Sequence, residues 1–542
     1  MKRLLMFVHY NKNNNLEDYV IYMLENIKTI FKKVIFISNS LLYKDNLKKI
    51  SGLYDKLITR ENIGFDFGAW KEAIIQESWE ELSGYDNITL INDSCFGPLY
   101  DLSEVYNYFE KQNIDFFGLT DYSRMEYGMP ITNGPIPQHI QSYFMCFKNN
   151  IIKSIVFKKF WDNVINEENV ELVIQKYETQ LTLILKENGF LCSSYIESKD
   201  LVNISFNRPD LCINNKIPLL KIKSFNDYKY PYFIQKLINS KSGYPYQLIN
   251  KYIVNNYDPQ INFNYSDKTF NSLSLFEYNE IENKSNIAIH INVIYLNVFN
   301  KYIEIFNKIN IEFDLYITTN TLENKNEIEN ILNGCSNNYK LIYISIEYEN
   351  DIINLINLDN YLNKYDIVGN FNMNNGFNGL DNYFNLLLYP MELIIKLFNS
   401  DKNIGIVFPD LPDNYIENNS KNLIKKTNMF WNKLKINREL NIDNKFPLLY
   451  PYDKMFWYRP GSINKYLNKN NIQLLNTYNN VAERLIIYIA WAEGYDYRIS
   501  TYGMIHESNI YKEYIIFQNR NKIIFNIILL KIFKKIKNIL KK

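Results

Sequence analysis

One short stretch near the front of the chain constrains the fold more than any other. Residues 88–91 (ITLI) form an apolar run that ends in Asn92, Asp93 and Ser94. An apolar run of this length that closes on small polar residues predicts a buried parallel strand with a polar loop at its carboxyl end. In open α/β sheets, ligands bind at that end of the strands. The stretch therefore predicts an α/β fold with a ligand site beside Asp93.

The flanking residues extend this α/β pattern. Residues 3–8 and 34–38 are further apolar runs, and residues 16–31 between them carry apolar side chains at helical spacing. A strand, a helix and a strand in this order open a nucleotide-binding α/β domain. A second α/β pattern begins near residue 287, after a stretch in which the pattern is weaker.

At 542 residues the chain is too long for one ordinary core. We predict four segments. They are a catalytic module over residues 1–205, an extension and linker over 206–283, a second module over 284–512, and a carboxyl-terminal helix over 513–542.

Short patterns recur in the same order in both halves, which predicts a duplication. Residues 85–88 (YDNI) are matched by 365–368 (YDIV), residues 142–148 (SYFMCFK) by 454–458 (KMFWY), and the pair Glu178 and Gly189 by Glu483 and Gly494. Where the first half has Asn92-Asp93-Ser94, the second is aligned with Asn370-Phe371-Asn372, which has no carboxylate. Hard cations prefer anionic oxygen ligands, so we expect the second module to be degenerate.

Composition excludes several function classes. The formal net charge of +1 argues against a nucleic-acid partner, because such domains carry a basic excess. The five cysteines are scattered without a CxxC pair, so we expect neither a disulfide framework nor a zinc site, and a reducing cytoplasm is the simplest compartment. We also expect neither a signal peptide nor a spanning helix.

Asp93 is the first candidate for chemistry. A sugar transferase must neutralise the diphosphate that leaves its donor, and a strand-end carboxylate that holds Mg²⁺ or Mn²⁺ does this. The alternative is a local turn in which Asn92, Asp93 and Ser94 cap nearby amides. Both interpretations stay open at this stage.

A second polar motif precedes this strand at residues 60–68 (RENIGFDFG). Gly64 would let the backbone approach a ligand, Asp66 would bind a base or ribose hydroxyl with Asn62 nearby, and Arg60 would face phosphate. The alternative is a helix start that Asp66 caps, although a helix amino terminus is itself an anion site.

Glu178, on a predicted helix, is the candidate general base, because an inverting sugar transfer needs a carboxylate that accepts the proton of the acceptor hydroxyl. A solvated helix face is the plainer interpretation. His9 ends the first strand and would line the nucleotide pocket. His139 and Gln141 lie at the end of a loop rich in Pro and Gly, on the expected acceptor side, although lone histidines are usually structural.

The last residues form a separate signal. Residues 520–542 mix eight Lys and Arg with Ile, Leu and Phe at helical spacing and contain no acidic residue. A basic amphipathic helix of this kind lies in the interface of an anionic membrane. The alternative is a helix that packs on the second module with a solvated lysine face.

Four motifs together resemble the rhamnan synthesis F family of bacterial glycosyltransferase-like proteins: ENIGFDFGAWK, NDSCFGP, HIQSYFMCFK and YETQLT, which cover about residues 1–260. The second half, with MFWYRP and VAERLIIYIAWAEGY, is similar to the second module that many members carry. It departs from the Gly-Arg-Asp cluster and Lys-rich loop of such members at residues 348–351 and 370–375.

The resemblance implies two GT-A-like modules, a dTDP-rhamnose donor and a lipid-linked glycan acceptor. It also implies that Asn92, Asp93 and Ser94 take the place of a DxD donor and metal motif. We therefore expect a rhamnosyltransferase of polysaccharide assembly at the inner face of the plasma membrane. The alternative from another class is a glycan-binding or scaffolding subunit without catalysis.

Overall fold

The protein is described from a computed structural model. The structure describes residues 1–224, 231–263, 268–272, 285–309, 311–319, 321–333, 339–341, 351–372, 383–411, 421–440, 442 and 448–502. The chain divides into two compact units, the first comprising Met1–Ile253 and the second Val254–Phe263 with the described residues from 268 onwards.

Unit one is built on an eight-stranded sheet of order β3-β2-β1-β4-β8-β6-β7, with β9 beside β6. The strands are β1 (Arg3–His9), β2 (Lys33–Ser38), β3 (Lys56–Thr59), β4 (Asn87–Asn92), β6 (Phe116–Tyr122), β7 (His139–Ile140), β8 (Phe144–Lys148) and β9 (Cys192–Ile196). Strands β3, β2, β1 and β4 are parallel, and β8 is antiparallel to both β4 and β6. The carboxyl ends of β1, β2, β4 and β6 and the start of β8 therefore share one edge.

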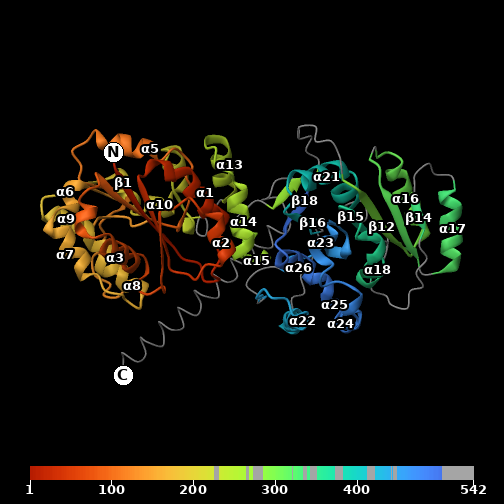
Figure 1. Ribbon diagram of the computed structural model, residues 1–542. Coiled ribbons are helices and arrows are strands. Elements are labelled where there is room, and N and C mark those ends of the chain that lie inside the picture. Colours follow the sequence, from red (N-terminus) through yellow and green to blue (C-terminus); the bar gives the residue numbers. More distant parts are fainter. Residues whose placement is uncertain are drawn as a thin grey trace, which may run out of the picture. The chain divides into compact units, whose positions relative to one another are not determined.

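Helices cover both faces of this sheet (Figure 1). They are α1 (Asp18–Ile27), α2 (Lys44–Lys49), α3 (Phe65–Glu77), α4 (Trp79–Leu82), α5 (Ser103–Glu110), α6 (Asn149–Ile152), α7 (Ile155–Asn163), α8 (Val170–Val173), the π-helical turn η2 (Ile174–Glu178), α9 (Thr179–Glu187), α10 (Ile204–Asn207), α11 (Pro209–Asn214) and α13 (Pro231–Lys241). Alternation along β1 turns Leu4 and Met6 toward α3, α7 and α9. Tyr106 of α5 packs on the opposite face, where its hydroxyl lies 2.7 Å from Thr89 Oγ1.

Unit two is built on a sheet of order β11-β18-β16-β17-β15-β12-β13-β14. The strands are β11 (Thr269–Asn271), β12 (Ile287–Val293), β13 (Asp314–Thr319), β14 (Tyr339–Leu341), β15 (Ile367–Asn372), β16 (Ile404–Pro409), β17 (Phe456–Tyr458) and β18 (Asp496–Thr501). Its helices include α16 (Leu296–Phe306), α17 (Leu322–Leu332), α18 (Asp351–Asn357), α21 (Met391–Ser400), α22 (Lys421–Lys433) and α26 (Ile486–Ala492), while α14 (Gln247–Asn256) runs across the division between the units.

The two sheets share one topology. The path β14-β13-β12-β15-β17-β16-β18 repeats β3-β2-β1-β4-β8-β6-β9 in order and in strand direction, with one antiparallel strand at the same place. The duplication predicted from short sequence echoes is therefore visible as a repeated fold.

Matching hydrogen bonds show which residues of the two units correspond to each other. The N–H of Lys2 donates to Asp86 Oδ2 at 2.6 Å, and the N–H of Asn286 donates to Asp366 Oδ2 at 2.9 Å. In both units the aspartate stands one residue before the central strand that ends in asparagine. Asp86 and Asp366 are thus equivalent, as the echo of residues 85–88 predicts.

This register corrects one detail of the sequence alignment. Asn92 corresponds to Asn372, the last residue of β15, and not to Asn370. The sequence comparison paired Asn92 with Asn370, the first asparagine after Asp366, which lies two residues before the structural equivalent. The residue that follows in the second unit is Met373, where the first unit has Asp93. Under either alignment the second unit has no carboxylate at this position.

The two glycines of the echo also have one structural role. Gly189 and Gly494 each follow the end of a helix with φ of +84° and +85°. This left-handed conformation suits glycine, because a side chain would be strained there. The offset of 11 residues from Glu178 and from Glu483 therefore marks equivalent helix ends.

Among the described residues, no helix is both long enough and apolar enough to cross a bilayer. The amphipathic helix expected at residues 513–542 lies outside the described residues.

Candidate functional site

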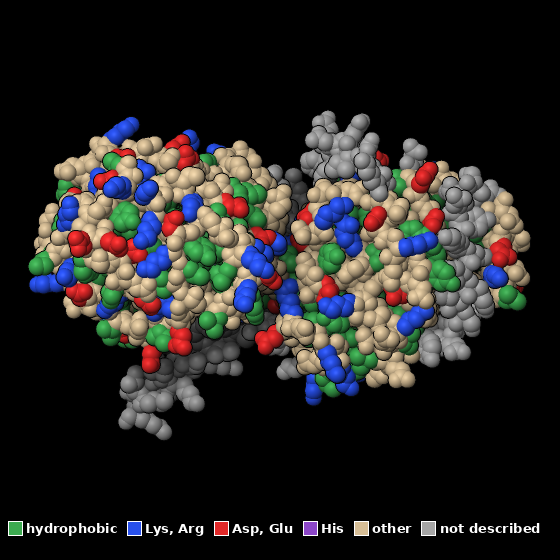
Figure 2. Space-filling view, in the orientation of Figure 1, with side chains coloured by type: hydrophobic (Ala, Val, Ile, Leu, Met, Phe, Trp, Pro, Cys, Tyr) green, Lys and Arg blue, Asp and Glu red, His purple; other side chains and the backbone are tan. Residues whose placement is uncertain are grey.

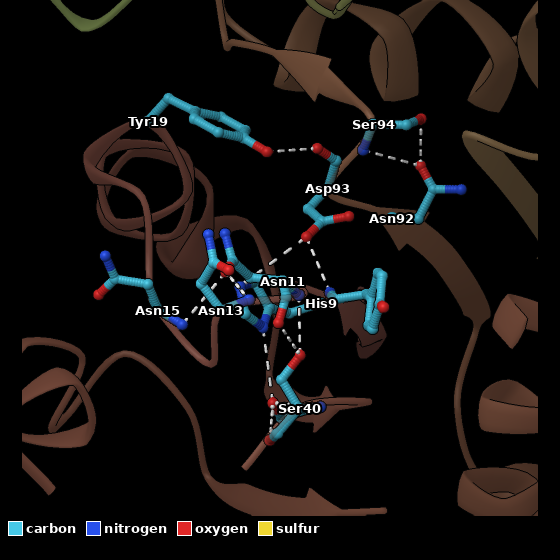
Figure 3. Close-up of polar contacts among 11 residues, drawn as sticks. His9, Asn11, Asn13, Asn15, Tyr19, Ser40, Asn92, Asp93 and Ser94 are labelled. Carbon is cyan, nitrogen blue, oxygen red and sulfur yellow. Dashed lines mark hydrogen bonds and ion pairs between the residues drawn. The ribbon is translucent and has the colours of Figure 1, made fainter. Parts of the chain in front are cut away.

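Asp93 follows β4 directly and reaches across to the β1 side of the sheet (Figure 3). Its Oδ2 accepts a hydrogen bond from the N–H of Tyr10 at 2.9 Å and lies 3.9 Å from His9 Nε2. Its backbone carbonyl accepts a hydrogen bond from the Tyr19 hydroxyl at 2.7 Å. These contacts join positions 83 and 74 residues apart, so Asp93 links the end of β4 to the loop after β1 and to α1, while Asn92 makes the local turn by accepting from the N–H of Ser94.

The Asp93 side chain is only 17% exposed. Burial, partly offset by the hydrogen bond from Tyr10 and reinforced by the nearby Asp66 carboxylate, raises the pKa of Asp93 to about 8. At pH 7 the Asp93 carboxyl is therefore mostly protonated. A cation bound beside it would favour the ionised form, which makes this group responsive to what binds there.

His9 ends β1 as an interior side chain, 1% exposed. Its ring stacks on Phe36 with a centroid separation of 5.8 Å. Burial lowers the pKa of His9 to about 4, so the imidazole is neutral at pH 7. The structure places the neutral ring of His9 beside Asp93, and its contact with a nucleotide stays a prediction.

The loop after β1 is ordered by its asparagines, which sequence analysis did not single out. The side-chain carbonyl of Asn11 accepts from the N–H groups of Asn13 at 2.8 Å and Asn15 at 3.3 Å. The N–H of Asn11 donates to Ser40 Oγ at 2.8 Å. This arrangement holds the loop against the Asp93 side of the edge (Figure 3). The available signal was an asparagine two residues before a run of further asparagines, the pattern of an Asx turn.

The two polar motifs found in the sequence meet at this edge. Asn92 Nδ2 donates to Asp66 Oδ2 at 2.7 Å, and Asn92 Oδ1 accepts from both the N–H and the hydroxyl of Ser94, at 3.2 and 2.6 Å. Asn92 therefore links the end of β4 to the first turn of α3, where Asp66 lies.

Asp66 does not cap its helix. The cap position of α3 is Gly64, which has a φ of +73°, and a side chain there would clash with Asn166. Burial and the Glu178 carboxylate raise the pKa of Asp66 to about 6, although Asn92 and Lys221 act in the opposite direction. Asp66 is thus a partly buried acid that changes charge near neutral pH.

Arg60 is held within the protein. Its Nε donates to Glu72 at 2.8 Å, its Nη1 to Asn39 at 2.9 Å, and its Nη2 to the Ile63 carbonyl at 2.6 Å. The side chain of Asn39 donates in turn to Asn62 Oδ1 at 3.0 Å. The structure therefore places Arg60 and Asn62 as supports of the loop before α3, and their contact with a donor stays a prediction.

Glu178 lies at the end of η2 and faces the start of β8. Its Oε1 accepts from the N–H and the hydroxyl of Ser142, at 3.0 and 2.8 Å. Burial raises the pKa of Glu178, but His139, Lys221 and the two bonds from Ser142 outweigh it and bring the pKa below its ordinary value. Glu178 is therefore an ionised carboxylate held at a fixed position, as a general base requires.

His139 lies close enough to Glu178 to stabilise its charge. Its Nδ1 is 2.8 Å from the Pro137 carbonyl, which can only accept, so this nitrogen carries a proton. The ring stacks on Tyr122 with centroids 5.3 Å apart. The structure thus brings His139 and the candidate base together at the same edge.

Gln141 is engaged within the protein at both ends of its side chain. Its Oε1 accepts from Thr120 Oγ1 at 2.6 Å and from Ser205 Oγ at 2.8 Å, and its Nε2 donates to Asn203 at 3.2 Å. These contacts place Gln141 in a buried network beside the site, and its contact with an acceptor stays a prediction.

Lys221, which no sequence pattern singled out, adds a positive charge to this edge. It lies on the short strand β10 (Leu220–Lys221), which pairs with β5 (Cys95–Phe96) directly after Ser94. Lys221 acts electrostatically on both Asp66 and Glu178. The available signal in the sequence was the apolar run of residues 217–220 (IPLL) directly before Lys221, which fits a short strand.

The equivalent place in unit two has different chemistry. Asn372 Nδ2 donates to the Asp453 carbonyl, and Glu483 Oε2 lies 3.6 Å from the ammonium of Lys454. Burial raises the pKa of Glu483 despite Lys454 and Arg484. The counterpart of Glu178 is therefore a weaker acid with a lysine against it.

The fold and this edge define the class of the protein. Two tandem α/β modules, with polar residues gathered at the carboxyl ends of the first sheet, confirm the predicted α/β fold class. The model of the family described as rhamnan synthesis protein F matches residues 34–495, most of the chain. The chain belongs to the rhamnan synthesis protein F family.

Further comparisons give more distant likenesses. A protein of Sinorhizobium fredii (strain NBRC 101917 / NGR234), the uncharacterized protein y4gN, is 22% identical over 169 residues, 31% of this chain and 42% of that protein. The chain thus matches less than half the length of this relative.

Two solved structures are similar at low identity. The glycosyltransferase GlyE of Streptococcus pneumoniae TIGR4 is 11% identical, with 78% of this chain and 94% of that chain covered and a TM-score of 0.25. Glucosyl-3-phosphoglycerate synthase of Mycobacterium tuberculosis, solved with Mn²⁺ and UDP, is 12% identical, with 36% and 70% covered and a TM-score of 0.21. Likenesses with TM-scores this low do not indicate a function for this protein.

Proposed function

We propose that this protein is a glycosyltransferase that transfers rhamnose from dTDP-rhamnose to a growing cell-surface polysaccharide of the rhamnan or O-antigen type. The observation that carries the proposal is the convergence of three carboxyl groups, Asp93, Asp66 and Glu178, at the strand edge of the first unit, in a member of the rhamnan synthesis protein F family. Carboxyl groups with pKa values shifted apart in one place are typical of acid–base sites.

The roles follow from the charge states. The acceptor hydroxyl oxygen attacks the anomeric carbon of the donor while Glu178, the ionised group, takes its proton. The bond from that carbon to the diphosphate oxygen breaks, and the nucleoside diphosphate leaves with the electron pair. Asp66 and the loop after β1 would hold the nucleoside, and Asp93 would lie beside the diphosphate.

A divalent metal fits this edge only together with the donor. Within the described residues, no three His, Cys, Asp or Glu side chains gather as a metal-binding group. Mg²⁺ is commonly bound by one or two carboxylates plus substrate phosphates, so Asp93 would hold Mg²⁺ or Mn²⁺ once a diphosphate supplies the remaining ligands. When bound, the metal would supply positive charge for the leaving group.

The acceptor is proposed to be a lipid-linked glycan at the inner face of the plasma membrane. The basic amphipathic sequence of residues 520–542 supports this proposal, because such segments bind anionic lipid surfaces. On the face that Figure 2 shows, basic and acidic side chains are interspersed, whereas residues 520–542 carry eight basic residues and no acidic residue.

We propose that the second unit does not bind the donor. Met373 follows the strand end where Asp93 stands in the first unit, and Glu483 faces a lysine instead of a serine. The donor would therefore occupy one site per chain.

The test is turnover of a panel of nucleoside diphosphate sugars, dTDP-rhamnose among them, read as release of nucleoside diphosphate in the presence of a rhamnan acceptor. We expect release with dTDP-rhamnose from the wild-type chain and a loss of at least about 100-fold in Glu178→Gln. Glycan binding without turnover of any donor would instead identify a scaffolding subunit.

A further inference from the structure

The motif NDSCFGP does more than place Asp93. Its residues Cys95 and Phe96 form β5, which pairs in antiparallel fashion with Lys221 and Leu220 of β10, more than 120 positions later. The N–H of Ile222 donates to the Ser94 carbonyl at 3.0 Å. These contacts attach the segment that contains β10, which lies outside the eight-stranded sheet, beside Asp93 at the end of β4.

Gly97 lets its own backbone lie close to residues 218 and 219, which precede β10. A side chain at Gly97 would come within 2.6 Å of the Pro218 carbonyl and 2.7 Å of the Leu219 side chain. The N–H of Leu99 donates to the same Pro218 carbonyl at 2.7 Å. The glycine of the motif therefore allows the backbone approach that sets the position of Lys221.

Lys221 lies half-buried among groups of opposite charge. Its ammonium sits over the ring of Tyr143, 5.3 Å from the centroid. It influences Asp66, Glu178 and the Cys95 thiol electrostatically. Yet within the part of the chain that the structure describes, no carboxylate oxygen lies within 4.0 Å of this ammonium.

Such an arrangement differs from an ordinary ion pair. Half-buried lysines usually lie against a carboxylate, as Lys33 and Lys56 do here with Glu77 at the far end of the same sheet. Lys221 instead has its backbone fixed by the pairing of β10 with β5 and its ammonium held on an aromatic face. Its three donors are then available to a ligand that brings negative charge.

We propose that Lys221 binds the diphosphate of the nucleotide donor and stabilises the negative charge that the diphosphate gains as the glycosidic bond breaks. This assignment rests on the proposed function, which places the diphosphate beside Asp93, the neighbour of Ser94 and Cys95. Neither Arg60, whose guanidinium nitrogens are bound within the protein, nor neutral His9 offers this charge. A lysine is a common binder of phosphate as a point charge.

The alternative is that Lys221 only balances the charge of Asp66 and Glu178. The two roles differ in what a substitution changes. A balancing lysine would alter the pH profile of turnover and leave the affinity for diphosphate unchanged, whereas a binding lysine contributes to affinity in proportion to the phosphates on the ligand.

The experiment measures equilibrium binding of UDP, dTDP, the matching monophosphates and inorganic pyrophosphate to the full chain. We expect Lys221→Met to weaken binding of the best nucleoside diphosphate by about 10–100-fold and of its monophosphate by much less, the range of a charge-assisted hydrogen bond. Lys221→Arg should stay within about 5-fold of wild type. Lys223→Met, an exposed lysine two residues later, is the matched control and should bind as wild type does.

A second measurement uses the wild-type chain alone, so that it does not depend on folding of a variant. Acetylation of lysine amines, read by mass spectrometry, should slow at Lys221 when the nucleoside diphosphate is present and stay unchanged at Lys223. If diphosphate binds but Lys221→Met binds it as tightly as wild type, or Lys221 is not protected, the assignment of Lys221 is wrong while the transferase proposal stands. If neither nucleoside diphosphate nor pyrophosphate binds the wild-type chain, both proposals fail.

Discussion

Asn92 Nδ2 donates a hydrogen bond to Asp66 Oδ2 at 2.7 Å, across 26 residues of sequence. This bond joins the end of β4 to the first turn of α3, and the hydroxyl of Ser94 holds the other end of the same carboxamide. The two motifs that stand out in the sequence are therefore one structural feature. Asp66 accepts one of its hydrogen bonds, and Asp93 is the next residue after Asn92.

Replacing Asn92 tests this link. Asn92→Ala removes the donor to a largely buried carboxyl group, so the free energy of unfolding should fall by about 1–3 kcal/mol. The pKa of Asp66 should rise above about 6, because the Asn92 bond is one of the contacts that lower it. Denaturant unfolding and the pH dependence of donor binding would measure both effects. Asn163→Ala, at an exposed helix end, is the control, and a variant as stable as that control would contradict the prediction.

Asp93→Asn should stabilise the protein while it impairs donor binding. The pKa of Asp93 is raised in the fold from its ordinary value of 3.8 to about 8, so the folded state binds more protons than the unfolded state between these values. The contribution of Asp93 to the free energy of unfolding is thus fully present below about pH 4 and is lost as the pH rises toward 8.

Because asparagine does not titrate and can still accept from Tyr10, the variant should gain up to about 5 kcal/mol at pH 8 and no more than about 2 kcal/mol at pH 5. Melting temperatures of both proteins at the two pH values measure the gain. An equal or lower melting temperature of the variant at pH 8 would show that the Asp93 carboxyl is not held neutral.

Glu178→Gln and Glu483→Gln form a matched pair, since the two glutamates occupy equivalent positions in the two units. The glutamine at position 178 keeps an oxygen that can accept from Ser142 but cannot take a proton. Turnover should fall by at least about 100-fold with donor affinity nearly unchanged. The glutamine at position 483 should leave turnover within about 2-fold of wild type. Equal losses in both variants would show that the glutamate has a structural role in each unit.

Much of this arrangement could be predicted because strand ends leave a strong signal. The apolar run before Asn92 placed β4, and the echo around Asp86 and Asp366 anticipated the repeated sheet. Alternation of apolar and polar residues depends on local physics, which a sequence carries directly.

The partners of the polar side chains could not be predicted in the same way. Nothing local to Arg60 shows that Asn39 and Glu72 bind its guanidinium, and nothing near Lys221 shows that it meets Cys95. These contacts join residues that only the folded chain brings together. Sequence patterns therefore identified the edge and most of its carboxyl groups, but not which cation belongs to the site.

The number of donor sites per chain separates the two units. Because the sequence has Met373 directly after Asn372, where the first unit has Asp93 after Asn92, and because Glu483 lies 3.6 Å from Lys454, we expect one donor bound per chain. Calorimetric titration with the donor that the chain turns over gives this number directly. Asp93→Asn should weaken that single event, and a second event with unchanged affinity in Asp93→Asn would show that the other unit binds donor too.

Donor binding with a divalent metal should also release a proton. At pH 7 a carboxyl group with a pKa of about 8 is about 90% protonated, and it must ionise before it can hold Mg²⁺ or Mn²⁺. We therefore expect close to one proton released per donor bound at pH 7, falling toward zero at pH 9. Titration heats in buffers of different ionisation enthalpy measure the number. Asp93→Asn is the control and should release none, because its amide has no proton to lose. A metal ligand must be ionised, and Asp93 is the carboxyl group that has to lose a proton to become one. If wild type releases no proton at pH 7, or if Asp93→Asn still releases one, the metal is therefore held by other groups.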